Sequence, residues 1–115
     1  MLDWNQYHAD LMDRIGDLAQ NSPDTVKGYQ TLSAAAQKSK LLDDKTRELI
    51  ALAVAVTTRC DGCIAVHSKR ALETGASKGE IAEALGVAVA LNAGAALVYS
   101  ARVMDAVAAD EAVES

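Results

Sequence analysis

The sequence contains no phenylalanine, and only 3% of its 115 residues are aromatic. Its hydrophobic half is therefore mainly Ala, Leu, Val and Ile, of which Ala and Leu are strong helix formers. Proline occurs once, and no segment rich in Pro, Gly or Ser divides the chain. No segment alternates apolar and polar residues for long enough to predict a strand. Length and composition thus predict a single all-α domain.

We also expect neither a basic patch nor a signal peptide. The formal net charge is −5, whereas nucleic-acid binding requires a concentrated basic face. The first residues, Met1 to Trp4, include an acid and have no apolar segment of the kind that signal peptides contain. The apolar run Leu49–Val56 is far shorter than the span of about 20 residues that a membrane helix needs. We expect a cytoplasmic protein that binds neither nucleic acid nor membrane.

The spacing of apolar residues predicts a bundle of about six helices. Capping signals predict several ends: Pro23 at a first helical position, Asp43 or a neighbour before the third helix, Gly75 at a helix end, and a capping box from Ser77 to Glu80. The sequence Asn92-Ala93-Gly94 predicts a break between the last two helices. The helices are expected at about residues 3–20, 22–40, 44–58 and 60–74, from 77 to the break, and from the break to 109.

Both cysteines lie in the motif Cys60-x-x-Cys63, and His67 follows four residues later. Residues i and i+4 share a helix face, so the imidazole of His67 can take the proton of the Cys63 thiol. The start of a helix favours the negative thiolate, which is the reactive form of cysteine. In a cytoplasmic protein such a pair indicates redox chemistry or metal binding rather than a structural disulfide.

Several alternatives remain open at this point. Glu48 stands at the polar start of an otherwise apolar helix, where pairing with Lys45 or Arg47 is the simplest interpretation. Cys60, Cys63, His67 and Glu48 together could bind zinc. The chain could also be a non-enzymatic oligomeric scaffold whose cysteines merely pack. His8, on the first predicted helix, is interpreted as incidental.

Four segments resemble the alkylhydroperoxidase D-like family of the carboxymuconolactone decarboxylase superfamily. They are Arg47-Glu48-Leu49-Ile50-Ala51-Leu52-Ala53-Val54, then Cys60-x-x-Cys63-x-x-x-His67, then Glu73-x-Gly75-Ala76-Ser77-x-x-Glu80-Ile81, and finally residues 90–99. The resemblance implies an all-α fold around a central helical hairpin, and assembly as a homotrimer or homohexamer. It implies a CxxC pair that reduces hydroperoxides or a partner disulfide, exchanging electrons with a peroxiredoxin or a lipoyl protein. No cofactor is expected.

By motif position, the resemblance assigns catalytic roles to Glu48, Cys60, Cys63 and His67. We expect Glu48 and His67 to activate Cys63, and Cys60 to close the disulfide. Some family members carry a second histidine inside the CxxC, where this chain has Gly62. The chain divides into an N-terminal helical arm (1–40), the family-like core (41–109) and a frayed tail (110–115). Two apolar regions, residues 49–56 and 88–98, independently favour a homo-oligomer.

Overall fold

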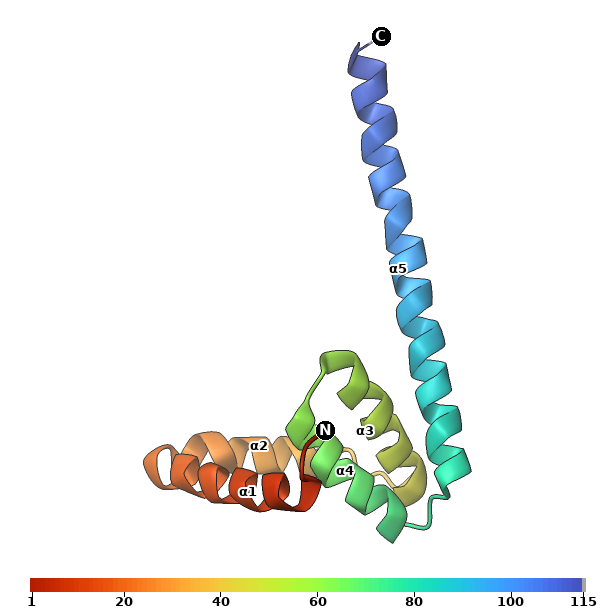
Figure 1. The fold of residues 1–115 in the computed structure, drawn as a ribbon. Coiled ribbons are helices and arrows are strands. Elements are labelled where there is room, and N and C mark those ends of the chain that lie inside the picture. Colours follow the sequence, from red (N-terminus) through yellow and green to blue (C-terminus); the bar gives the residue numbers. More distant parts are fainter. Residues whose placement is uncertain (115) are drawn as a thin grey trace.

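The computed structural model describes residues 1–114, which form a single all-helical domain (Figure 1). This confirms the predicted fold class, although the described chain has five helices rather than six. The helices are α1 (Trp4–Asn21), α2 (Pro23–Ala35), α3 (Asp44–Thr58), α4 (Asp61–Glu73) and α5 (Lys78–Glu114).

Side chains cap the helices at positions that the sequence indicates. The Asp43 carboxylate accepts a hydrogen bond from the backbone N–H of Thr46 at 2.8 Å, at the start of α3. The capping box before α5 is confirmed: the Glu80 N–H donates to Ser77 Oγ at 3.0 Å, and the Ser77 N–H donates to Glu80 Oε1 at 2.9 Å. Gly75 follows α4 with φ +92°, a conformation that favours glycine.

The predicted break at Asn92-Ala93-Gly94 is wrong, because α5 is continuous from Lys78 to Glu114. The Asn92 side chain donates to the Ala88 carbonyl at 2.7 Å and to Thr57 Oγ1 at 2.8 Å. The Asn92 side-chain amide thus donates hydrogen bonds to its own helix and to α3, and the backbone of α5 remains helical through this position. Helix also continues through residues 110–114, where the sequence predicts a frayed tail, and Ser115 lies outside the described residues. The division of the chain at residue 40 remains a prediction.

Helix α5 is long and apolar enough, by length and composition alone, to cross a membrane. Its most apolar 18-residue window has a mean hydropathy of 1.8, and 6% of that window is buried. The predicted break at Asn92 would divide this segment into two helices, each too short to cross a membrane. A helix that packs against other subunits has a similar apolar composition. The hydropathy of α5 therefore indicates apolar surface that the single chain leaves unburied, and it does not by itself indicate a membrane location.

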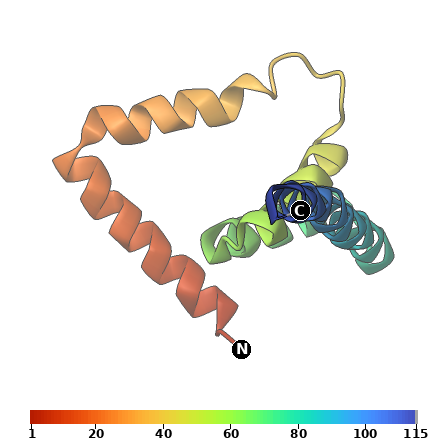
Figure 2. The same cartoon turned by 90° about the horizontal axis from the view of Figure 1, so that it is seen from above.

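The α3–α4 hairpin lies at the centre of the packing. Helix α3 packs against α4 and α5, while α1 packs against α2 and α4. Viewed from above, α1 and α2 form a V-shaped arm whose apex stands away from the other helices (Figure 2). The buried cluster consists of Leu52, Ala71 and Ala76, with Leu49 and Ile81 packed against it. The core is small, and most of its buried members are alanines.

The isolated chain exposes far more surface than a compact protein of its mass. Its accessible surface is 8851 Å², whereas a compact 12.0 kDa monomer exposes about 6,000 Å². Its radius of gyration is 19.6 Å, against about 13 Å for a compact domain of this length. The C-terminal half of α5 accounts for much of the difference, since it projects beyond the body of the molecule (Figure 1).

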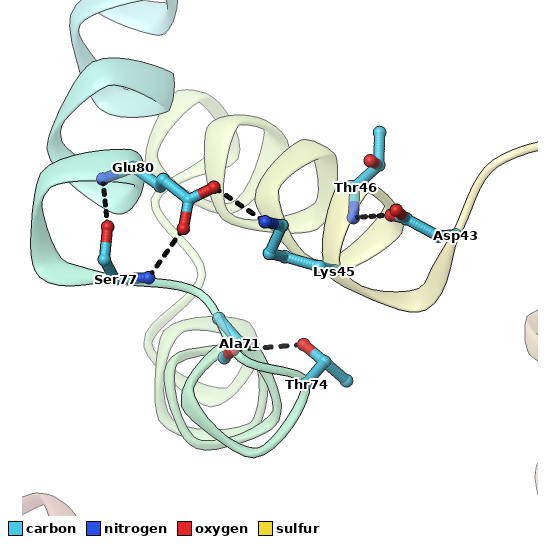
Figure 3. A network of polar contacts seen from close by, with 7 residues as sticks. All are labelled: Asp43, Lys45, Thr46, Ala71, Thr74, Ser77 and Glu80. Carbon is cyan, nitrogen blue, oxygen red and sulfur yellow. Dashed lines mark hydrogen bonds and ion pairs between the residues drawn. The ribbon is translucent and has the colours of Figure 1, made fainter.

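A polar network joins the starts of α3 and α5 (Figure 3). The Lys45 ammonium donates to Glu80 Oε2 at 2.8 Å, while the other carboxylate oxygen of Glu80 caps its own helix at Ser77. The hydrogen bond and charge of Glu80 raise the pKa of Lys45 above its ordinary value. The hydrogen bond from Lys45 lowers the pKa of Glu80. This contact ties together two helices that both pack against the small core.

Candidate thiol redox site

The turn between α3 and α4 places the cysteine pair at a helix start. Arg59 ends α3 in the left-handed conformation, with φ 55°, and turns the chain away from the helix axis. Cys60 is then the N-cap of α4, and its sulfur accepts a hydrogen bond from the Cys63 N–H at 3.1 Å. Both sulfurs therefore lie at the positive end of the α4 dipole, where a thiolate is stabilised.

Cys60 and Cys63 are joined by a disulfide, with their Cα atoms 5.2 Å apart. That separation falls within the ordinary range for disulfides. The structure thus shows the oxidised form of the pair, and the chain has no other cysteine. The loose backbone geometry of a first helical turn lets residues three apart come close enough to bond.

Glu48 and His67 meet across the α3–α4 interface. His67 Nδ1 lies 2.6 Å from Glu48 Oε2, and the two side chains are 25% and 14% exposed, respectively. The alternative partners of Glu48 are engaged elsewhere: Lys45 pairs with Glu80, and Arg47 pairs with Asp44. The interpretation of Glu48 as a solvated partner of Lys45 or Arg47 is therefore wrong.

The hydrogen bond with Glu48 orients the His67 ring. An ionised carboxylate only accepts hydrogen bonds, so Nδ1 is the nitrogen that carries the proton. Nε2 is then left to exchange a proton with a neighbouring group, and it has no hydrogen bond within residues 1–114. Cys63 precedes His67 by one turn on the same face of α4, which makes its sulfur the nearest thiol in sequence.

Helix α1 covers the middle of the CxxC motif. A Cβ atom added to Gly62 would lie 2.9 Å from Leu11 Cδ2 and 4.0 Å from the Tyr7 hydroxyl. The Leu11 side chain therefore occupies the space that a larger residue at position 62 would need. Sequence reasoning missed this contact, because only the apolar stripe of α1 hints that Leu11 faces another helix.

The four candidate residues do not form a metal centre in this structure. The two sulfurs are bonded to each other, so neither is a free thiolate ligand. Within the described part of the chain, no cluster of three or more His, Cys, Asp or Glu side chains could hold a metal ion.

Fold and site together define an all-helical protein with a CxxC disulfide beside a Glu–His pair. Residues 23–106 match the carboxymuconolactone decarboxylase family, and the chain belongs to that family. The family includes decarboxylases and peroxidase-like members. Membership is consistent with the resemblance to alkylhydroperoxidase D-like proteins in the same superfamily.

The chain is similar to proteins from several bacteria. It is 48% identical to an uncharacterized protein of Haemophilus influenzae over 110 residues, covering 96% of this chain and 97% of that one. It is 35% identical to uncharacterized protein 4 in the cox locus of Paracoccus denitrificans over 86 residues, covering 75% and 78% of the two chains.

Solved structures share the fold. A carboxymuconolactone decarboxylase family protein from Legionella pneumophila superposes with a TM-score of 0.73 at 36% identity, covering 85% of this chain and 88% of that one. A protein from Methanobacterium thermoautotrophicum gives a TM-score of 0.69 at 30% identity, covering 75% of this chain and 97% of that one.

Proposed function

We propose that the protein is a thiol-dependent oxidoreductase that reduces hydroperoxides through Cys60 and Cys63. One observation carries the proposal: the cysteine disulfide lies at the start of α4, one turn before a histidine oriented by a half-buried glutamate. A redox pair needs a stabilised thiolate and a nearby proton carrier, and these residues supply both. Reduction of a disulfide in a partner protein would use the same groups.

The proposed cycle starts from the reduced dithiol. His67 takes the proton of Cys63, and the thiolate attacks the terminal oxygen of the hydroperoxide. The O–O bond breaks, the proton passes to the leaving alkoxide to give an alcohol, and Cys63 becomes a sulfenic acid. The Cys60 thiol then attacks the Cys63 sulfur, releasing water and forming the observed disulfide. An external dithiol returns two electrons and two protons.

The electron partner follows from the same chemistry. We propose a dithiol donor such as a lipoyl protein, or exchange with a peroxiredoxin, without any bound cofactor. Support comes from the family resemblance. It also comes from the position of both cysteines at a helix start, where neither residue is buried and a partner could reach them. The cytoplasmic location expected from the sequence belongs to the same proposal.

The test is a peroxidase assay on the full chain. Protein, cumene hydroperoxide and dihydrolipoamide are mixed, and loss of peroxide is followed with and without protein. We expect catalytic turnover by the wild type, none by Cys63→Ser, and at most one equivalent consumed by Cys60→Ser. Peroxide loss no faster than with dihydrolipoamide alone, together with no reduction of a model disulfide, would contradict the proposal and favour a scaffold role.

We also propose that the protein works as a homotrimer or homohexamer. The accessible surface exceeds that of a compact monomer by about 2,900 Å², which is in the range that obligate subunits bury. Large apolar side chains of α5 form much of this surface: Leu91, Leu97 and Val98 are 66%, 76% and 74% exposed. A second copy of the chain, presenting the same face, is the partner that this surface fits. The threefold character comes from the family resemblance.

A further inference from the structure

A groove between α1 and α4 runs beside the cysteine pair without containing it. Its volume is about 730 Å³, within the range of small-molecule sites. Ile64 and Ser68, which follow Cys63 and His67 directly in sequence, both line it. The groove therefore shares α4 with the redox residues but opens on a neighbouring face of the helix.

The walls of the groove combine apolar and polar side chains. Trp4 of α1 and Ile64, Ala65 and Leu72 of α4 provide apolar surface. Lys69 and Ser68 of α4, with His8 and Asn5 of α1, provide polar groups. None of the lining residues is acidic, although the chain as a whole has a formal charge of −5. An anionic ligand in the groove would therefore lie near the Lys69 ammonium, with no carboxylate among the lining residues.

The polar side chains of the groove make no hydrogen bond or ion pair with residues 1–114. Neither the Lys69 ammonium nor the His8 imidazole makes an ion pair or hydrogen bond within residues 1–114. Helical hydroxyls elsewhere, such as those of Thr31, Thr57 and Ser100, donate to the carbonyl four residues back. Ser68 is half-buried in mid-helix and makes no such bond in the described chain.

We infer that this groove binds an organic carboxylate with an apolar body, such as a medium-chain fatty acid. The carboxylate would accept hydrogen bonds from Lys69, with Ser68, His8 and Asn5 as further donors. The hydrocarbon would pack on Trp4 and Leu72. Binding does not depend on the proposed redox cycle, because no lining residue takes part in it. That a carboxylate-bearing hydroperoxide would sit beside the cysteines rests on the proposed function.

Trp4 makes the inference directly measurable, because it is the only tryptophan and it lines the groove. The oxidised full-length protein is titrated with decanoate while Trp4 fluorescence is recorded. We expect a saturable change, a weaker response to decanol, and a weaker one still to decyltrimethylammonium. Lys69→Gln should weaken decanoate binding about fivefold without changing the response to decanol. Lys27→Gln, on α2, is the matched control and should bind like the wild type.

Two results would overturn the inference. One is the absence of any saturable change with decanoate in the wild type. The other is equal affinity for decanoate, decanol and the ammonium compound, which would mean unspecific apolar contact at Trp4. Ser68→Ala gives an independent check on the polar end: it should weaken decanoate binding and leave decanol binding unchanged. Because all these measurements use the oxidised protein, a failed peroxidase assay has no bearing on them.

Discussion

A single carboxylate on α3 determines what the histidine on α4 can do. Glu48 is 14% exposed, and its only hydrogen bond among the described side chains is the one with His67. Without that bond the imidazole could rotate and present either nitrogen to the cysteines. The contribution of Glu48 to the proposed chemistry is thus orientation of the ring, rather than direct contact with a substrate.

Substitution of this pair should slow the reaction of the reduced protein with a thiol reagent. We expect iodoacetamide alkylation at neutral pH to be about a hundredfold slower in His67→Gln, which loses the proton acceptor, and about tenfold slower in Glu48→Gln, which loses ring orientation. The rate is measured by mass spectrometry of quenched samples. Glu83→Gln, an exposed position on α5, is the control. Unchanged rates in both variants would remove the pair from the mechanism.

The two cysteines should differ in reactivity when studied one at a time. Cys63 has His67 one turn further along the same face, whereas Cys60 is the N-cap residue. Cys60→Ser should therefore leave a fast thiol, and Cys63→Ser a slow one, in the same alkylation assay. If Cys60 is the faster thiol, the roles of nucleophile and resolving cysteine are reversed, although the dithiol cycle itself is retained.

At the level of elements, α3 and α5 are held together at their starts by Lys45 and Glu80. The pair is partly exposed, with side chains 35% and 39% accessible, so its contribution to stability is modest and sensitive to salt. Its importance is geometric. Glu80 simultaneously caps α5, so one carboxylate fixes both where α5 begins and which helix it lies against.

The Lys45–Glu80 ion pair makes the stability of the protein depend on pH in a defined way. The folded-state pKa of Glu80 is lowered, so its contribution is full above the ordinary value of 4.5 and is lost as the pH falls through the lower folded value. The pKa of Lys45 is raised, so its contribution is full below 10.5 and is lost as the pH rises through the higher folded value. The difference in urea midpoint between wild type and Glu80→Gln should be constant between these limits.

The same comparison with Glu83→Gln gives the baseline, because Glu83 carries no ion pair within residues 1–114. We expect the difference between wild type and Glu80→Gln to shrink in acid and again in strong base. A difference that does not change with pH would contradict a contribution from the Lys45–Glu80 ion pair.

Local signals predicted the elements well where the cause is itself local. Asp43 and the Ser77–Glu80 box satisfy N–H groups within their own first turn, so the sequence contains the whole interaction. Asn92 failed as a signal for a helix break because its side chain donates one of its hydrogen bonds to Thr57, thirty-five residues away in sequence. The contacts of Leu11 with Gly62, and of His8 with the groove, likewise depend on how α1 lies on α4, which no spacing within α1 can predict.

The candidate site shows the same limit. The cysteine spacing and the i, i+4 relation to His67 are local, and pattern alone could propose them. The partner of Glu48 was not decidable in this way, because Lys45 and Arg47 are both much nearer to it in sequence than His67. The family resemblance indicated a role for Glu48, and the packing of α3 on α4 provides its physical basis.

On the scale of the whole molecule, the chain is extended and buries few residues. The α1–α2 arm and the projecting part of α5 extend from a small core (Figures 1 and 2).

If copies associate through α5, a charge placed there should separate them. Leu91→Lys should lower the molar mass from multi-angle light scattering toward that of the monomer, because a buried unpaired charge is costly. Leu41→Lys, in the connection between α2 and α3, is the control. A monomeric wild type at micromolar concentration would contradict the assembly.

The small core of the single chain bears on how stability depends on protein concentration. If the chain folds only as it associates, as the proposed assembly implies, its melting temperature should rise with protein concentration. Dilution would then act as a denaturant. In a cell, newly made copies would remain open to proteases until enough had accumulated to find partners, and the synthesis rate would set a threshold below which no working protein is retained.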